Sequence, residues 1–168
     1  PGSDGVVSID QGAVATVDDP APVGSNGWMN GSLRVRLAQG GSAADDALAI
    51  VNEGTAAGEI GILGSVVNFG GTAIGTFIGG TGGADLVVNF NNAATTPAVS
   101  ALVESLSFEN ANPSTSPLSR VIEVTLMDGD GASSSVSVIT INMNVGGTVL
   151  TYVWEGDEST FFNTPGNW

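Results

Sequence analysis

The stretch Leu33-Arg34-Val35-Arg36-Leu37 alternates apolar and basic residues without interruption. This alternation has the period of a β-strand that buries one face. It predicts that the three apolar side chains lie in a core and that both Arg side chains lie in solvent. Residues 120–127 alternate in the same way, with Ile122, Val124 and Leu126 inward.

Short segments with similar composition surround this strand, and paired glycines separate several of them. One late segment shifts its inward phase from Val136 and Val138 to Ile139, which predicts a bulge. The predicted strands are 6–9, 13–17, 33–37, 47–51, 59–62, 65–69, 73–78, 85–90, 120–127, 136–143 and 148–154.

One helix is predicted, over residues 96–106. Thr96 is a suitable N-cap, and Pro97 suits the first helical position because its missing N–H has no partner there. Apolar residues from Val99 to Leu106 then recur on one helical face. Short strands with tight turns and one helix predict an all-β antiparallel sandwich rather than repeated βαβ units.

The composition excludes several classes of function. The 168 residues include no Cys and no His, so disulfides, thiolate metal sites and the usual general base are absent. Seventeen acidic residues against three Arg give a net charge of −14, which makes nucleic acid and anionic lipid poor partners. No apolar run approaches the ~20 residues of a membrane span, so membrane insertion is not expected.

The ends of the chain differ from its middle. Pro1-Gly2-Ser3 is typical of an expression-tag remnant. Aromatic residues become frequent after Gly147, which predicts a β-sandwich over 4–146 and, over 147–168, a linker with a strand or the start of a neighbouring module. The aromatic tail suits either packing or stacking on a sugar.

Several segments, taken in order, resemble the cadherin-like repeat modules of large secreted bacterial surface proteins, including adhesins with RTX-type C-termini. The resemblance covers residues 5–145. It rests on 31–35, 45–50, 74–83, 86–91, 94–95 with the helix, 108–110, 119–121 and 125–131. It implies a Greek-key, Ig/cadherin-like sandwich, tandem repetition, an extracellular or cell-surface location and calcium bound near the module ends.

The turn Asp128-Gly129-Asp130-Gly131 is the main candidate metal site. Ca²⁺ takes six to eight oxygen ligands, and an Asp-x-Asp turn directs two carboxylates the same way. An ordinary Asp-Gly hairpin turn is the other interpretation of these residues. The resemblance favours Ca²⁺, with Asp128 and Asp130 as ligands. It adds Asp18 and Asp19 as secondary ligands and Asn30 as an amide-oxygen ligand.

Two other motifs favour structural roles. Asp45 and Asp46 follow a polar loop and are expected to cap a turn. The glycines of 79–83 are expected to form a hairpin turn, because a single copy of an RTX-like motif cannot stack.

No enzymatic function is expected, because no pair of Glu residues is placed across a cleft. The sequence predicts a calcium-binding structural or adhesive module, acting as a spacer or adhesion unit beside neighbouring modules of the same polypeptide. Two alternatives remain open. One is a subunit that self-associates into a surface layer, sheath or fibre, and the other is a carbohydrate-binding module with glycan ligands.

Overall fold

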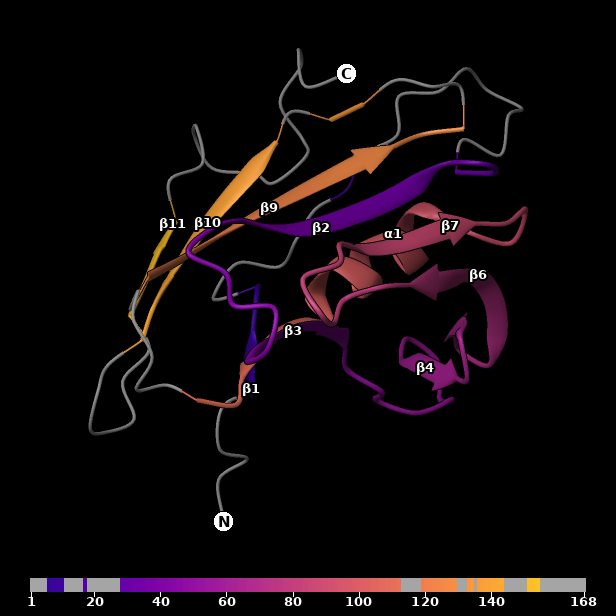
Figure 1. Ribbon diagram of the computed structural model, residues 1–168. Helices are drawn as coiled ribbons and strands as arrows, with labels where there is room; N and C mark the ends of the chain where they lie inside the picture. Colours follow the sequence, from indigo (N-terminus) through magenta and orange to yellow (C-terminus); the bar gives the residue numbers. More distant parts are fainter. Residues whose placement is uncertain are drawn as a thin grey trace.

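The computed structural model describes residues 6–10, 17, 28–112, 119–129, 133–134 and 136–143, together with the backbone of 151–154. These residues form two antiparallel β-sheets and one α-helix (Figure 1). The predicted all-β antiparallel sandwich is therefore confirmed.

Most elements lie close to the segments predicted from the sequence, but β8 was not predicted as a strand, and residues 13–16 of the predicted strand 13–17 lie outside the described residues. Their bounds are β1 (Val6–Ser8), β2 (Ser32–Gln39), β3 (Asp46–Ile50), β4 (Ile60–Leu63), β5 (Val66–Phe69), β6 (Thr72–Ile78), β7 (Leu86–Phe90), α1 (Thr96–Glu104), β8 (Leu106–Asn110), β9 (Ser119–Met127), β10 (Ser137–Asn142) and β11 (Thr151–Trp154).

The strand order places an early strand in the middle of the large sheet. The small sheet has the order β1-β8-β3, and the large sheet has the order β11-β10-β9-β2-β7-β6-β5-β4. Strands β4 to β7 and β9 to β11 are two meanders, and β2 pairs with β7 on one side and β9 on the other. The two halves of the large sheet are thus joined through β2 (Figure 1).

The alternation that predicted β2 is reproduced in its burial. Leu33 and Val35 are 0% exposed, and Leu37 is partly buried against the same core. The inward residues of β9 are likewise 0% exposed. Each such side chain contributes roughly 1.5–3 kcal/mol by leaving water, so the pairing of β2 with β9 is held mainly by burial.

The helix is shorter than predicted. Its N-cap is Thr95 rather than Thr96, and the Thr95 hydroxyl accepts a hydrogen bond from the Ala98 amide at 3.4 Å. The predicted end at residue 106 is wrong, because Leu106 pairs with Ile50 in the small sheet. Strand pairing therefore takes the last residue of the apolar stripe out of the helix.

The predicted phase change within β10 is also wrong in its position. Val136 is 51% exposed, and the inward phase already begins at Ser137. Met127 lies opposite Ser133, and Val124 lies opposite Ser137. The chain therefore advances four residues from 133 to 137 while β9 advances only three, from 124 to 127. The extra residue thus precedes β10.

The glycines of 79–83 belong to the turn between β6 and β7, as predicted. Gly80 has a φ of 88°, and its carbonyl accepts a hydrogen bond from the Leu48 amide at 2.7 Å. A Cβ at Gly80 would collide with the Leu48 carbonyl oxygen. This glycine therefore lets the turn lie on β3, which ties the small sheet to the large one.

The predicted strand near the C-terminus is present as β11. It pairs antiparallel with β10 and so continues the large sheet beyond residue 146. Its side chains and the remaining aromatic tail lie outside the described residues.

Candidate functional site

The start of β2 and the ends of β7 and β9 meet at one rim of the large sheet. Ser32 lies opposite both Asn89 and Met127. One residue earlier, the Gly31 carbonyl accepts a hydrogen bond from the Phe90 amide at 2.9 Å. Residues 28–31, 89–90 and 127–129 are called the rim below.

Gly31 brings two of the predicted calcium ligands together. A Cβ on Gly31 would overlap the Met127 carbonyl oxygen and lie 3.0 Å from the Asp128 carbonyl carbon. Only glycine permits this backbone contact, which brings the turn before β2, with Asn30, to the end of β9, where Asp128 follows. Sequence reasoning treated Asn30-Gly31 as a ligand position and did not recognise the glycine as the contact residue.

The two ligands differ in exposure. Asn30 is exposed and adopts a φ of 69°, a left-handed conformation that Asn tolerates better than most residues. Asp128 is 7% exposed. The rim thus holds one buried carboxyl side chain and one exposed amide side chain. Both are ligand types that Ca²⁺ uses.

The other three predicted ligands, Asp18, Asp19 and Asp130, lie outside the described residues. Val17, which precedes Asp18, donates its amide to the Ser100 hydroxyl of α1 at 3.4 Å. Within the described residues no group of three or more carboxylates is placed to share a metal ion. The calcium site therefore stays a prediction.

Trp28 anchors the rim to the helix. Its indole nitrogen donates to the Thr96 hydroxyl at 3.1 Å, and its ring meets Phe90 edge-on with centroids 6.0 Å apart. The side chain is 1% exposed. Trp28 falls between the predicted strands 13–17 and 33–37, and no role was predicted for it. A lone large aromatic residue in a polar segment was the signal available, because such side chains are usually buried.

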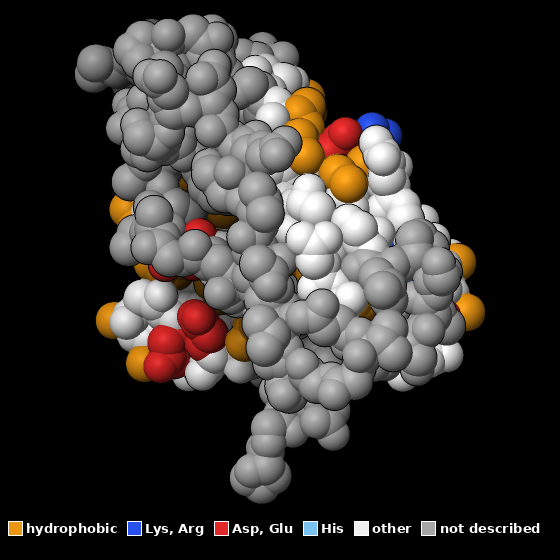
Figure 2. All heavy atoms as spheres, turned by 90° about the vertical axis from the view of Figure 1, so that its left-hand side faces the viewer, with side chains coloured by type: hydrophobic (Ala, Val, Ile, Leu, Met, Phe, Trp, Pro, Cys, Tyr) orange, Lys and Arg blue, Asp and Glu red, His pale blue; other side chains and the backbone are white. Residues whose placement is uncertain are grey.

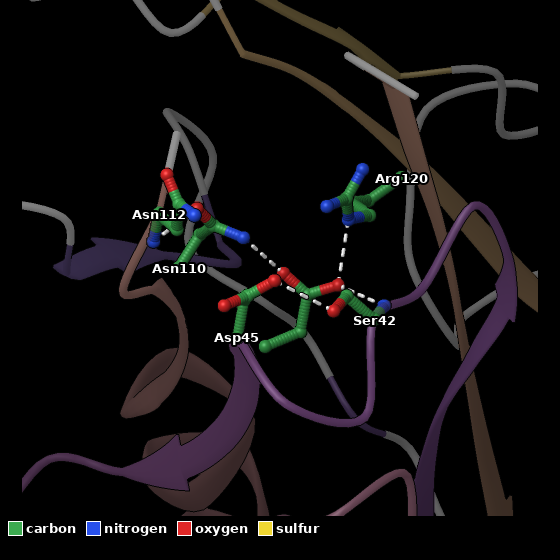
Figure 3. A network of polar contacts seen from close by, with 6 residues as sticks. Ser42, Asp45, Asn110, Asn112 and Arg120 are labelled. Carbon is green, nitrogen blue, oxygen red and sulfur yellow. Dashed lines mark hydrogen bonds and ion pairs between the residues drawn. The ribbon is translucent and has the colours of Figure 1, made fainter. Parts of the chain in front are cut away.

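A second polar cluster lies at the opposite end of β9 from the rim, where the strand begins. The Asp46 carboxylate accepts hydrogen bonds from Arg120 Nε at 2.6 Å and Asn110 Nδ2 at 2.5 Å. The Ser42 amide donates to the same carboxylate at 2.6 Å. Figure 3 shows these groups converging from β3, β8, β9 and the loop before β3. The cluster therefore joins the two sheets.

This second cluster is structural and does not suit a metal ion. Asp45 accepts a hydrogen bond from the Ser42 hydroxyl at 2.8 Å, so the predicted capping of a turn by Asp45 and Asp46 is confirmed. The buried Arg120 guanidinium occupies the position that a cation would need at Asp46. Its positive charge would repel a second cation.

All three basic side chains of the chain are engaged with carboxylates. Arg120 pairs with Asp46, and on the outer face of β2 Arg34 pairs with Asp85 while Arg36 pairs with Glu123. Figure 2 shows exposed acidic side chains in several places on one face, with much less basic surface. Acidic residues therefore far outnumber basic ones, by seventeen to three.

Burial and nearby acidic side chains change the pKa of one carboxyl group, that of Glu104. Partial burial, followed by the charges of Asp10 and Glu53, raises the pKa of Glu104 above its ordinary value of 4.5. Glu104 lies at the C-terminal end of α1, where the helix dipole also disfavours an anion.

Comparisons with known proteins add no relative. No family model matches the chain, and the searches of curated proteins and of solved structures find no match. Within the described residues, no helix is long and apolar enough to cross a membrane. The fold and the rim thus define an all-β sandwich protein whose candidate site is acidic.

Proposed function

We propose that this chain is a calcium-binding, extracellular structural module, a spacer or adhesion unit of a larger surface protein. The observation that carries the proposal is the close approach of Gly31, the residue after Asn30, to the backbone of Met127 and Asp128 at one rim of the sandwich. The resemblance to cadherin-like modules of bacterial surface proteins supports the same assignment, because calcium in such modules lies at the ends of the sandwich.

The charge distribution gives the rim a reason to bind a cation. The chain holds no Lys and no His, and its three Arg face seventeen Asp and Glu, for a net charge of −14. Neighbouring carboxylates repel one another, and a divalent cation shared between them removes this repulsion.

The ion would be held by the oxygens that the rim supplies. Asp128 and Asp130 would provide carboxylates from the turn after β9, and Asn30 would provide its amide oxygen. Asp18 and Asp19 would complete the set or bind a second ion. A cation shared between the start of β2 and the turn after β9 would stiffen one end of the module against its neighbour.

The proposal includes no catalytic role. Glu53 and Glu59 both accept hydrogen bonds from backbone amides, and Glu123 pairs with Arg36. These contacts give the three carboxylates structural roles.

A thermal unfolding measurement in calcium and in chelator tests the proposal. Calcium at about a hundred times its Kd stabilises the folded state by ~2.7 kcal/mol, because it binds only that state. For a domain of this size the melting temperature should rise by roughly 5–10 °C. Asp128→Asn and Asp130→Asn should each reduce that rise, whereas Glu109→Gln on β8 should leave it unchanged.

A gain-of-function variant makes the test specific to the rim. Asn30→Asp adds a second carboxylate to the rim that holds Asp128, so it should lower the melting temperature in chelator and increase the calcium-induced rise. Ser65→Asp adds the same charge in the turn between β4 and β5 and is the matched control. The proposal fails if calcium leaves the wild-type melting temperature unchanged, or if both added carboxylates alter its effect equally.

A further inference from the structure

Strand β4 is one edge of the large sheet, so its outer side offers backbone groups to another strand. In the register with β5, Ile60 lies opposite Phe69 and Ile62 opposite Val67. The amides of Ile60 and Ile62 point away from β5, because both donate to residues on the other side. An edge of this kind is a template for strand addition unless something covers it.

The segment Asn52–Gly54 covers this edge. Glu53 accepts a hydrogen bond from the Ile60 amide at 2.9 Å, and Asn52 accepts one from the Ile62 amide at 3.1 Å. In return, the backbone amides of Glu53 and Gly54 donate to the Ile60 carbonyl at 2.8 and 3.3 Å. Two side chains thus occupy the amides that an added strand would use.

The segment lies directly on the strand. A Cβ on Gly61 would collide with the Gly54 carbonyl oxygen, so the glycine in β4 permits this close approach. Asn52 and Glu53 themselves are exposed. Hydrogen bonds, rather than buried apolar surface, therefore hold the two side chains in place.

The same end of the sheet carries unusual apolar exposure. Leu63, at the end of β4, is 76% exposed, and Ile78, at the end of β6, is 65% exposed. The Phe77 amide donates to the Ser65 carbonyl at 2.9 Å, which places the end of β6 beside the turn that follows Leu63. An uncovered β4 would therefore combine open backbone groups with an apolar contact surface.

We propose that Asn52 and Glu53 form an edge guard that prevents β4 of one copy of this chain from pairing with β4 of a second copy. Two β4 strands can pair antiparallel about a twofold axis, so a second copy is a self-complementary partner. Glu53 also places a negative charge on the edge. A second copy would have to desolvate that charge, which is a known protection of edge strands.

The test compares Asn52→Ala/Glu53→Ala with the control Gln39→Ala/Glu109→Ala, which removes an amide and a carboxylate from exposed positions on β2 and β8. Sedimentation velocity over a range of concentrations, in chelator, measures self-association. The guard variant should form dimers or larger species at concentrations where the control and the wild type sediment as monomers. In dilute solution, its Ile60 and Ile62 amides should exchange about fivefold faster or more, the factor that a net ~1 kcal/mol hydrogen bond gives.

Two further variants separate the guard from general destabilisation. Adding Leu63→Lys to the guard variant should restore the monomer, because the charge blocks edge pairing without replacing the lost acceptors. Glu53→Gln keeps an acceptor for Ile60 and should associate less than the guard variant. The inference is overturned if the guard variant stays monomeric, if its Ile60 and Ile62 amides keep wild-type protection, or if Leu63→Lys has no effect on its association.

Discussion

The buried pair of Asp46 and Arg120 makes the sharpest stability prediction. Both side chains are 0% exposed, and the Asp46 carboxylate accepts hydrogen bonds from Arg120, Asn110 and Ser42. Asp46→Asn keeps the shape of the side chain but removes its charge. Arg120 would then be a buried cation that has lost its ion pair with Asp46, since a guanidinium does not lose its proton in proteins.

Breaking a buried ion pair by removing one partner costs about 3–5 kcal/mol. That is a large share of the roughly 5–15 kcal/mol that separates folded from unfolded domains. The exposed pair of Arg34 and Asp85 is the internal comparison, because its side chains are 54% and 30% exposed. Asp85→Asn should therefore cost only about 0–1 kcal/mol.

Urea denaturation measures both losses as shifts of the transition midpoint at constant slope. The double variant Asp46→Asn/Arg120→Met should lose less than the sum of its two single variants, because it leaves no buried charge behind. The reasoning is refuted if Asp46→Asn costs less than ~1 kcal/mol, as Asp85→Asn should, or if the two single losses add.

Two further changes test the rim and the acidic surface. Gly31→Ala should destabilise the fold by ~1–3 kcal/mol in urea denaturation, because its Cβ meets the Met127 carbonyl oxygen, whereas Ser32→Ala should have little effect. Glu104→Gln should be slightly more stable than the wild type near pH 7, by a few tenths of a kcal/mol, since this carboxyl is mostly exposed. A folded-state pKa above 4.5 means that this carboxyl disfavours folding as pH rises through that pKa. The gap between the two proteins in thermal unfolding should therefore close towards pH 4, and a gap that widens there would contradict the assignment.

The regular alternation in β2 and β9 was readable in advance because one buried face imposes a period of two on each strand. Local sequence patterns gave wrong predictions for Leu106, which was assigned to the helix, and for Val136, which was assigned to an inward position of a strand. Leu106 continues the helical stripe of α1 but pairs with β3, and Val136 is apolar but lies before β10 and is exposed. Local patterns cannot decide such residues, because distant strands compete for them.

The candidate sites follow the same division. Acidic turns and the Asn30-Gly31 dipeptide were visible as ligand types, whereas the contact of Gly31 with the end of β9 was not. The buried Arg120 was taken for an ordinary member of an alternating strand, and its pairing with Asp46 spans 74 residues of sequence. The edge guard at β4 was likewise invisible, because its acceptors precede the strand in a loop of ordinary composition.

The sequence by itself determined that this protein is an antiparallel β structure with a large excess of negative charge. The strand period, the glycine turns and the residue counts can be read from the local sequence, without knowledge of which distant segments pack together. Only the tertiary structure decided that β2 joins two meanders, that Gly31 lies against the backbone of Asp128, and that Asp46 pairs with Arg120. Those outcomes depend on which distant segments exclude water from one another, and burial of this kind is a property of the assembled core.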